Sequence, residues 1–195
     1  MHHDIEEVLK VTKRYEEKTR KFCQPIMTSF GINQFYHAKI TQNGRWVGLN
    51  TNHDWAEHYF AENLHLIDPL LVHPDYFPKH SFVINDIDNM DVNLIRAEAI
   101  KKSRIHFNLS LINRVEDGVE YFLFGLTSSQ SMQRNKLFNE IPLLRFFVKQ
   151  FKWEFRKLYA ALEDLSVDIN TIIGPTFRKP KVAIFPEPIT RRLIL

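Results

Sequence analysis

The chain has 195 residues, which is enough for one ordinary domain and a tail. Hydrophobic residues make up 44% of the sequence and include 16 Phe, which excludes a chain that is disordered throughout. The formal net charge is +3, but five basic residues and one acidic residue fall within residues 171–195, so the rest of the chain is close to neutral. A near-neutral body is poorly suited to binding a nucleic-acid backbone directly.

A single cysteine, Cys23, excludes an internal disulfide. No apolar stretch approaches the roughly 18–20 residues that a membrane span needs, and the acidic start MHHDIEEVLK lacks the apolar core of a signal peptide. The sequence therefore predicts a cytoplasmic protein without membrane contact.

The first half of the chain alternates helical and extended patterns. Apolar residues recur at steps of three and four from Asp4 to about Phe22, which predicts a helix. Residues 33–40 and 45–49 are predicted to pair as a hairpin, because Asn43-Gly44 favours the positive φ of a tight turn. A short helix is then expected over residues 52–62.

The second half continues with a proline-containing loop over residues 67–80, a short strand at 81–84 and a helix over 92–104. A second hairpin is predicted from residues 107–115 and 119–126. Its turn is marked by Asp117-Gly118.

A long aromatic-rich helix is expected over residues 133–165, with Pro142 kinking or delimiting it. Short hairpins require antiparallel pairing, so the fold class is α/β (α+β): a three-layer α/β/α sandwich around a five-stranded antiparallel sheet, PAS/GAF-like. The predicted sensor domain covers residues 1–167. Residues 168–195, with four prolines after Gly174 among basic residues, are expected to form an extended linker.

The most informative stretch is Trp55-Ala-Glu-His-Tyr59, followed by Asp68-Pro69. On a helix, Trp55 and Tyr59 are i and i+4 and share one face, and Asp68 returns beside them where the chain turns. The indole N–H can donate to a ligand carbonyl and the carboxylate can accept from a ligand N–H. Trp and Tyr at this spacing are also common core residues, and Asp-Pro is a common turn, so a purely structural role is the alternative.

The pattern Trp-x3-Tyr-x8-Asp-Pro resembles the signature of the autoinducer-binding domain of LuxR-type quorum-sensing transcriptional regulators. This resemblance implies that Trp55 contacts the lactone carbonyl of an acyl-homoserine lactone, that Asp68 accepts from its amide N–H, and that Tyr59 lines the acyl side. It also implies a homodimer whose DNA contacts come from a C-terminal helix-turn-helix domain. That domain is absent from this chain, so we expect an excised sensor domain or a natural short form that sequesters full-length partners.

The sequence departs from the family pattern at four cage positions, which are Thr51, Val83 or Ile84, Asn108, and Gly125 or Thr127. Thr51, Val83 and Thr127 are therefore further candidate ligand contacts, and the departures favour a signal other than the usual lactone or a cavity filled by side chains. The alternative function is a signal-independent dimerisation or interaction module. For dimerisation, the long helix carries more aromatic surface than one packing face needs.

The sequence offers no positive support for catalysis or metal binding. None of the common phosphate-binding, nucleophile or zinc motifs occurs, so we expect no enzyme and no cofactor other than a possible small-molecule signal. His53, His58 and His65 are spaced by five and seven residues, which does not bring imidazoles together on one helix face. Cys23 is expected to be a small buried apolar residue.

Overall fold

The computed structural model describes residues 3–77, 82–84, 90–127, 130–163, 166–174 and 177. The strands are β1 Ile32–Thr41, β2 Arg45–Asn50, β3 Phe82–Ile84, β4 Phe107–Val115, β5 Gly118–Leu126 and β6 Val167–Asp168. The α-helices are α1 His3–Phe30, α2 His53–Ala61, α3 Met90–Ser103, α4 Ser131–Asn139, α5 Ile141–Glu163 and α6 Ile169–Ile173. Two short 3₁₀ helices, Leu64–Leu66 and Pro74–Tyr76, lie between α2 and β3.

The sheet is antiparallel throughout, with strand order β3-β4-β5-β1-β2-β6. The five predicted strands and both hairpins are confirmed, and the two-residue β6 extends the sheet beside β2. In the first hairpin Gly44 has a φ of +81°, as the Asn-Gly turn predicts. The central strands β1 and β5 pair along the whole of β1, from Ile32 to Thr41. This long pairing gives a rigid scaffold for side chains at both ends of the sheet.

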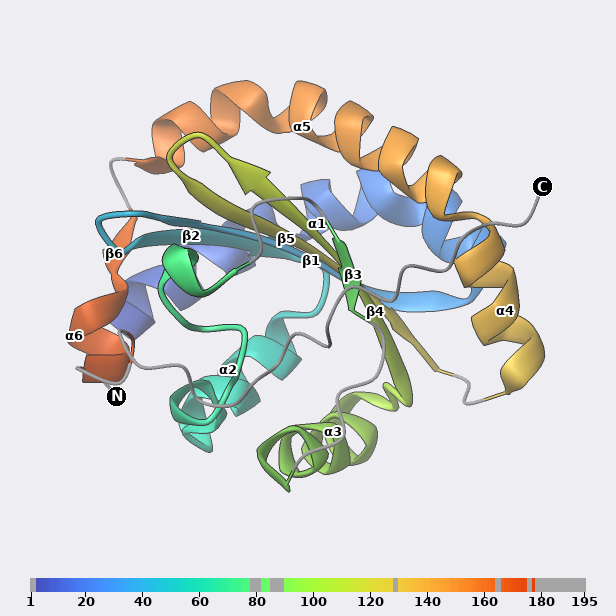
Figure 1. Ribbon diagram of the computed structural model, residues 1–195, viewed down its shortest axis with the longest axis horizontal. Coiled ribbons are helices and arrows are strands. Elements are labelled where there is room, and N and C mark those ends of the chain that lie inside the picture. Colours follow the sequence, from blue (N-terminus) through green and yellow to red (C-terminus); the bar gives the residue numbers. More distant parts are fainter. Residues whose placement is uncertain are drawn as a thin grey trace.

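Helices cover both faces of the sheet, which confirms the predicted three-layer α/β/α sandwich (Figure 1). One face packs against α5 and the C-terminal half of α1 in a core rich in phenylalanine, which includes Phe35, Phe122, Phe124, Phe151 and Phe155. The other face is covered by α2, by the segment that follows α2, and by the N-terminal part of α1. The helix α3 lies on the same side as α2 (Figure 1).

Two helix boundaries differ from the prediction, and proline is involved in both. The first helix continues through Pro25 to Phe30, because Cys23, Ile26 and Met27 bury against the sheet and this packing outweighs the proline's missing N–H. The expected long helix over residues 133–165 is two helices, α4 and α5. Pro142 is the second residue of α5. A backbone N–H in the first turn of a helix has no helical acceptor, so the N–H that proline lacks costs the helix no hydrogen bond there.

The extended linker predicted from residue 168 is wrong for its first residues. Asp168 pairs with Arg45 in β6, and its side chain accepts a hydrogen bond from the backbone N–H of Asn170 at the start of α6. Ile169, Ile173 and Phe177 are buried in the core on the α2 side. These apolar residues anchor the chain to the domain beyond residue 167, and residues 178–195 lie outside the described part of the chain.

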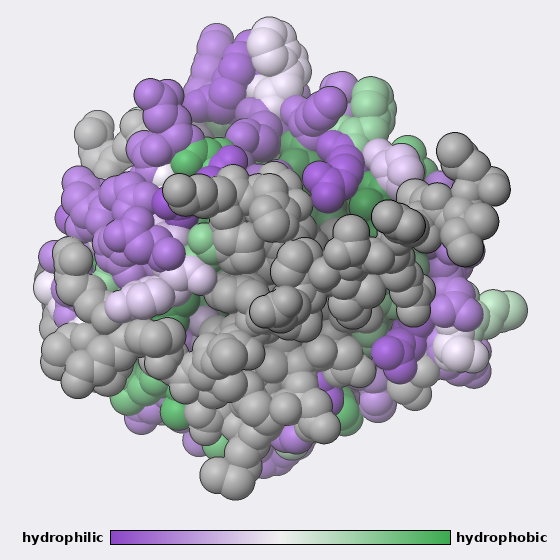
Figure 2. All heavy atoms as spheres, in the orientation of Figure 1, coloured by the Kyte–Doolittle hydropathy of each residue, from purple (hydrophilic) through white to green (hydrophobic). Residues whose placement is uncertain are grey.

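Within the described ranges, no helix is long and apolar enough to cross a membrane. On the described part of the face seen in Figure 2, hydrophilic and hydrophobic residues are interspersed.

Candidate ligand-binding cavity

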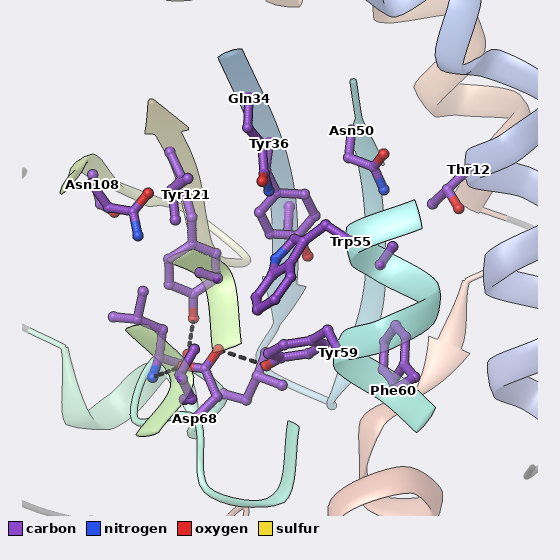
Figure 3. Close-up of a pocket in the computed structure, with 18 of the residues that line it drawn as sticks. Thr12, Gln34, Tyr36, Asn50, Trp55, Tyr59, Phe60, Asp68, Asn108 and Tyr121 are labelled. Carbon is purple, nitrogen blue, oxygen red and sulfur yellow. Dashed lines mark hydrogen bonds between the residues drawn. The ribbon is translucent and has the colours of Figure 1, made fainter. Parts of the chain in front are cut away.

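A cavity of about 130 Å³ lies between the sheet and the helices α2 and α3. Side chains of β1, β2, β4 and β5 form its floor, and side chains of α2, α3 and the segment after α2 cover it (Figure 3). The lining is predominantly apolar, with a small number of polar side chains. This is the usual composition of a site for a small amphipathic molecule.

Local sequence explains how α2 presents its aromatic face. The side chain of Asn52 accepts a hydrogen bond from the backbone N–H of Trp55 at 3.1 Å and so caps the helix. Trp55 and Tyr59 then follow one helical turn apart, with their ring centroids 6.1 Å from each other. Both side chains point into the cavity (Figure 3). They therefore share one face of the helix, as the sequence predicts.

Asp68 closes one end of the cavity. Its Oδ2 accepts a hydrogen bond from the Tyr59 hydroxyl at 2.5 Å, and its Oδ1 accepts one from the backbone N–H of Leu70 at 2.8 Å. The structure therefore brings together the three residues predicted from the sequence, Trp55, Tyr59 and Asp68, in one cavity wall. A carboxylate offers about four acceptor positions, so it can serve several donors at once.

Two further tyrosines, which sequence reasoning missed, stand beside this carboxylate. Tyr121 donates its hydroxyl hydrogen to the backbone carbonyl of Leu70 at 2.7 Å, and Tyr36 lines the cavity from β1. Burial raises the pKa of Tyr36, and burial followed by the charge of Asp68 raises the pKa values of Tyr59 and Tyr121 well above the ordinary range. All three phenols are neutral at physiological pH. The strict alternation of side chains along the two hairpins was the signal that could have found them.

Two of the further candidate ligand contacts, Thr51 and Thr127, lie apart from this wall. Thr51 is fully buried, and its hydroxyl bonds to the backbone N–H of Phe35 at 2.9 Å, so it joins β1 to the end of β2. Thr127 is exposed after β5, and neither threonine is among the described residues that line the cavity. Val83 and Ile84 pair with β4 through their backbones, but their side chains lie outside the described set. Asn108 does line the cavity.

His53 and His58, two of the three histidines considered as metal ligands, contact other side chains. His53 lies 3.3 Å from the Thr12 hydroxyl and 3.0 Å from Glu57, and His58 bonds to Glu98 of α3 at 2.8 Å. In the part of the chain that the structure describes, no group of three or more His, Cys, Asp or Glu side chains could hold a metal ion. Cys23 is fully buried, and burial raises the pKa of its thiol, so it stays protonated and unreactive at neutral pH.

No protein-family model and no curated protein matches this sequence. Among solved structures, SdiA from Escherichia coli is similar at 12% sequence identity over 76% of this chain and 67% of that chain, with a TM-score of 0.48. A second structure, SdiA in complex with octanoyl-rac-glycerol, is similar at 12% identity over 80% of this chain and 66% of that chain, with a TM-score of 0.49.

Proposed function

We propose that this chain is a ligand-sensing and dimerisation domain of the LuxR type, which binds a small amphipathic signal between the sheet and α2. The observation that carries the proposal is the meeting of Trp55, Tyr59 and Asp68 in the wall of one apolar cavity. The signal is an acyl-homoserine lactone or a different molecule with a similar division into polar and apolar parts. In a regulator, a helix-turn-helix domain joined to this one would contact DNA in response to the signal.

The proposed binding mode uses groups that already stand in the cavity wall. The indole N–H of Trp55 donates to a carbonyl oxygen of the signal, and Asp68 accepts from an amide or hydroxyl donor. Tyr59 holds Asp68 through the 2.5 Å hydrogen bond, so the carboxylate keeps its orientation before the ligand arrives. The apolar part of the signal then fills the remainder of the cavity.

A thermal-shift titration tests the proposal. A ligand that binds only the folded state raises the free energy of unfolding by about 2.7 kcal/mol when its concentration is a hundred times its Kd. Acyl-homoserine lactones of increasing chain length should therefore raise the Tm as their concentration increases. Lipophilic fractions of cell extracts extend the test to other signals. Asp68→Ala should remove the shift. No stabilisation of the unaltered protein by any lactone or fraction would contradict the proposal.

An alternative function is a signal-independent interaction module, and the outer face of α5 favours it. Leu143, Phe146 and Trp153 share this face and are 43%, 58% and 64% exposed, which is high for large apolar side chains. The guanidinium of Arg156 lies 3.7 Å from the Trp153 ring centroid, within the range of a cation–π contact.

The Asp68→Ala variant separates the two functions, with sedimentation velocity reporting dimerisation and thermal shift reporting the ligand response. The module predicts a dimer that Asp68→Ala leaves intact and that Phe146→Glu with Trp153→Glu dissociates, with no ligand effect on either protein. The sensor predicts the ligand-dependent Tm that Asp68→Ala abolishes.

A further inference from the structure

A second polar group of residues lies on the cavity floor, away from Asp68. Gln34 of β1 and Asn108 of β4 both face Gly125 of β5, because each is the register partner of that glycine. The three residues form one row across three strands. A Cβ atom at Gly125 would stand 3.2 Å from Asn108 Oδ1 and 3.3 Å from Gln34 Cβ, so the glycine leaves the space between the two amides open.

The amide oxygens in this row have no hydrogen-bond partner among the described residues. Gln34 Oε1 and Asn108 Oδ1 are buried and accept no hydrogen bond from the described residues, and both side chains line the cavity. Gln34 is only 4% exposed. Burying an amide oxygen without a donor is costly, and in native proteins such atoms usually have a partner. Here the open side of both atoms is the cavity.

The amide row and the carboxylate lie at opposite ends of the floor (Figure 3). Tyr121, which bonds to the segment carrying Asp68, precedes Gly125 by four residues on β5. At about 3.4 Å per residue, Tyr121 and Gly125 are roughly 14 Å apart along the strand. Between them the floor and cover are Leu123, Trp55 and other largely apolar groups.

We propose that Gln34 and Asn108 form a second polar subsite, and that the cavity takes an elongated, two-ended molecule with an apolar middle. One polar group of this molecule meets Asp68 and Trp55, and a hydroxyl or amide N–H at its other end donates to the two side-chain oxygens. Asp68 is the only Asp, Glu, Lys, Arg or His among the described residues that line the cavity, so no charged side chain faces the amide row and the ligand end there is uncharged. This inference rests on the proposed function and specifies its ligand class.

A pair of straight-chain probes tests the subsite, with octanol carrying one hydroxyl and α,ω-octanediol carrying one at each end. Isothermal titration calorimetry of the full chain should show that the diol binds about three- to ten-fold more tightly than octanol. This ratio of Kd values corresponds to the net free energy of one neutral hydrogen bond. The hexane and decane pairs show the chain length at which this preference is greatest.

Gln34→Leu and Asn108→Leu should each reduce the diol preference while octanol binds as before. Gln34→Leu should also raise the Tm of the ligand-free protein, because the unpartnered oxygen is gone, and this confirms that the variant folds. Gln133→Leu is the matched control. It removes another buried amide oxygen that lacks a described partner but lies away from the cavity, so it should leave the diol preference unchanged.

Gly125→Ala tests the same space without altering either amide, and its methyl group should selectively weaken the diol. Equal binding of octanol and octanediol to the unaltered protein would overturn the subsite, as would a diol preference that survives both leucine variants. If neither the alcohols nor acyl-homoserine lactones bind, the proposed function fails together with the subsite. Binding of lactones and octanol without any diol preference would overturn the subsite alone.

Discussion

At the scale of single residues, Asp68 shows how the protein supports a charge in an apolar wall. A half-buried carboxylate needs donors in place of the water it has lost, and this one has the Tyr59 hydroxyl and the Leu70 backbone N–H. The same carboxylate raises the pKa of Tyr59, in addition to burial, so the phenol stays a donor over the whole physiological range. The two side chains depend on each other.

Tyr59→Phe should therefore destabilise the ligand-free protein by about 1 to 3 kcal/mol, because a hydrogen bond to a charged, half-buried carboxylate is lost. Urea unfolding followed by circular dichroism measures this difference. Tyr15→Phe is a suitable control, since Tyr15 also packs against a core and its hydroxyl makes no hydrogen bond that the structure describes. Equal losses in the two variants would argue against a role for the Tyr59 hydroxyl.

His37 occupies the opposite face of the sheet and is 2% exposed. Its ring stacks on Phe122 at 4.3 Å between centroids, and its Nδ1 forms a hydrogen bond with the Tyr159 hydroxyl. Glu120 lies 4.0 Å from Nε2 and is paired with Lys152 at 2.6 Å. Burial, and then the positive charges of Lys152 and Lys39, lower the pKa of His37 well below 6.5.

This lowered pKa predicts an acid-labile fold. Below about pH 6.5 the histidine gains a proton in the unfolded chain but not in the folded one, so the free energy of unfolding falls as pH falls. The contribution of neutral His37 to the free energy of unfolding is fully present above that pH. Below it, the free energy of unfolding falls by at most about 1.4 kcal/mol per pH unit. Urea titrations between about pH 5 and 7 measure the slope. His37→Phe should flatten it, whereas His106→Gln, at a partly exposed position, should leave it intact.

At the scale of elements, α1 is the clearest case of tertiary packing overriding local preference. Pro25 cannot donate to the carbonyl of Lys21, yet the helix continues because its next turn buries Ile26, Met27 and Phe30. Pro25 itself is exposed. Its ring therefore costs a backbone hydrogen bond without contributing to the core.

Pro25→Ala should accordingly stabilise the protein, by up to about 3 kcal/mol, because alanine restores the donor and removes the clash with the preceding turn. Pro142→Ala is the matched control, because the first turn of α5 has no helical acceptor for that N–H and little change is expected. Thermal and urea unfolding of both variants give the comparison. A loss of stability in Pro25→Ala would mean that the proline shapes α1 to fit the sheet.

Elements whose structure is encoded by neighbouring residues were predictable from the sequence, and elements that depend on contacts with distant residues were not. Both hairpins were predictable because their turns, at Asn43-Gly44 and Asp117-Gly118, and their strand alternation are encoded locally. The continuation of α1 and the docking of α6 were not, because they depend on apolar contacts with distant residues. Trp55, Tyr59 and Asp68 were found from a local pattern. Gln34 and Asn108 meet only through the register of three strands, which no short pattern records.

At the scale of the whole molecule, the two faces of the sheet are built differently. The face under α5 is packed with phenylalanine rings that contact one another, such as Phe35 and Phe151 at 4.9 Å between centroids. The face under α2 and α3 contains the cavity and its buried polar groups. Side chains around a cavity make fewer dispersion contacts than side chains in a close-packed core, so we expect the cover of this face to be held less firmly than the phenylalanine core.

This asymmetry predicts a graded pattern of amide hydrogen exchange. In the ligand-free protein β1 and β5 should exchange slowest, because each pairs on both sides and supports the phenylalanine core, whereas α2 and α3 should open through local fluctuations below the global free energy. A ligand in the cavity adds contacts to α2 and α3 and should slow their exchange well before that of the central strands changes. Mass-spectrometric exchange with and without an acyl-homoserine lactone or octanediol measures both effects. Only a loosely held cover can admit a molecule to a site that the sheet closes from below. Uniform protection of both faces without ligand, or ligand protection centred on α5, would therefore show that the cavity cover is not the mobile element.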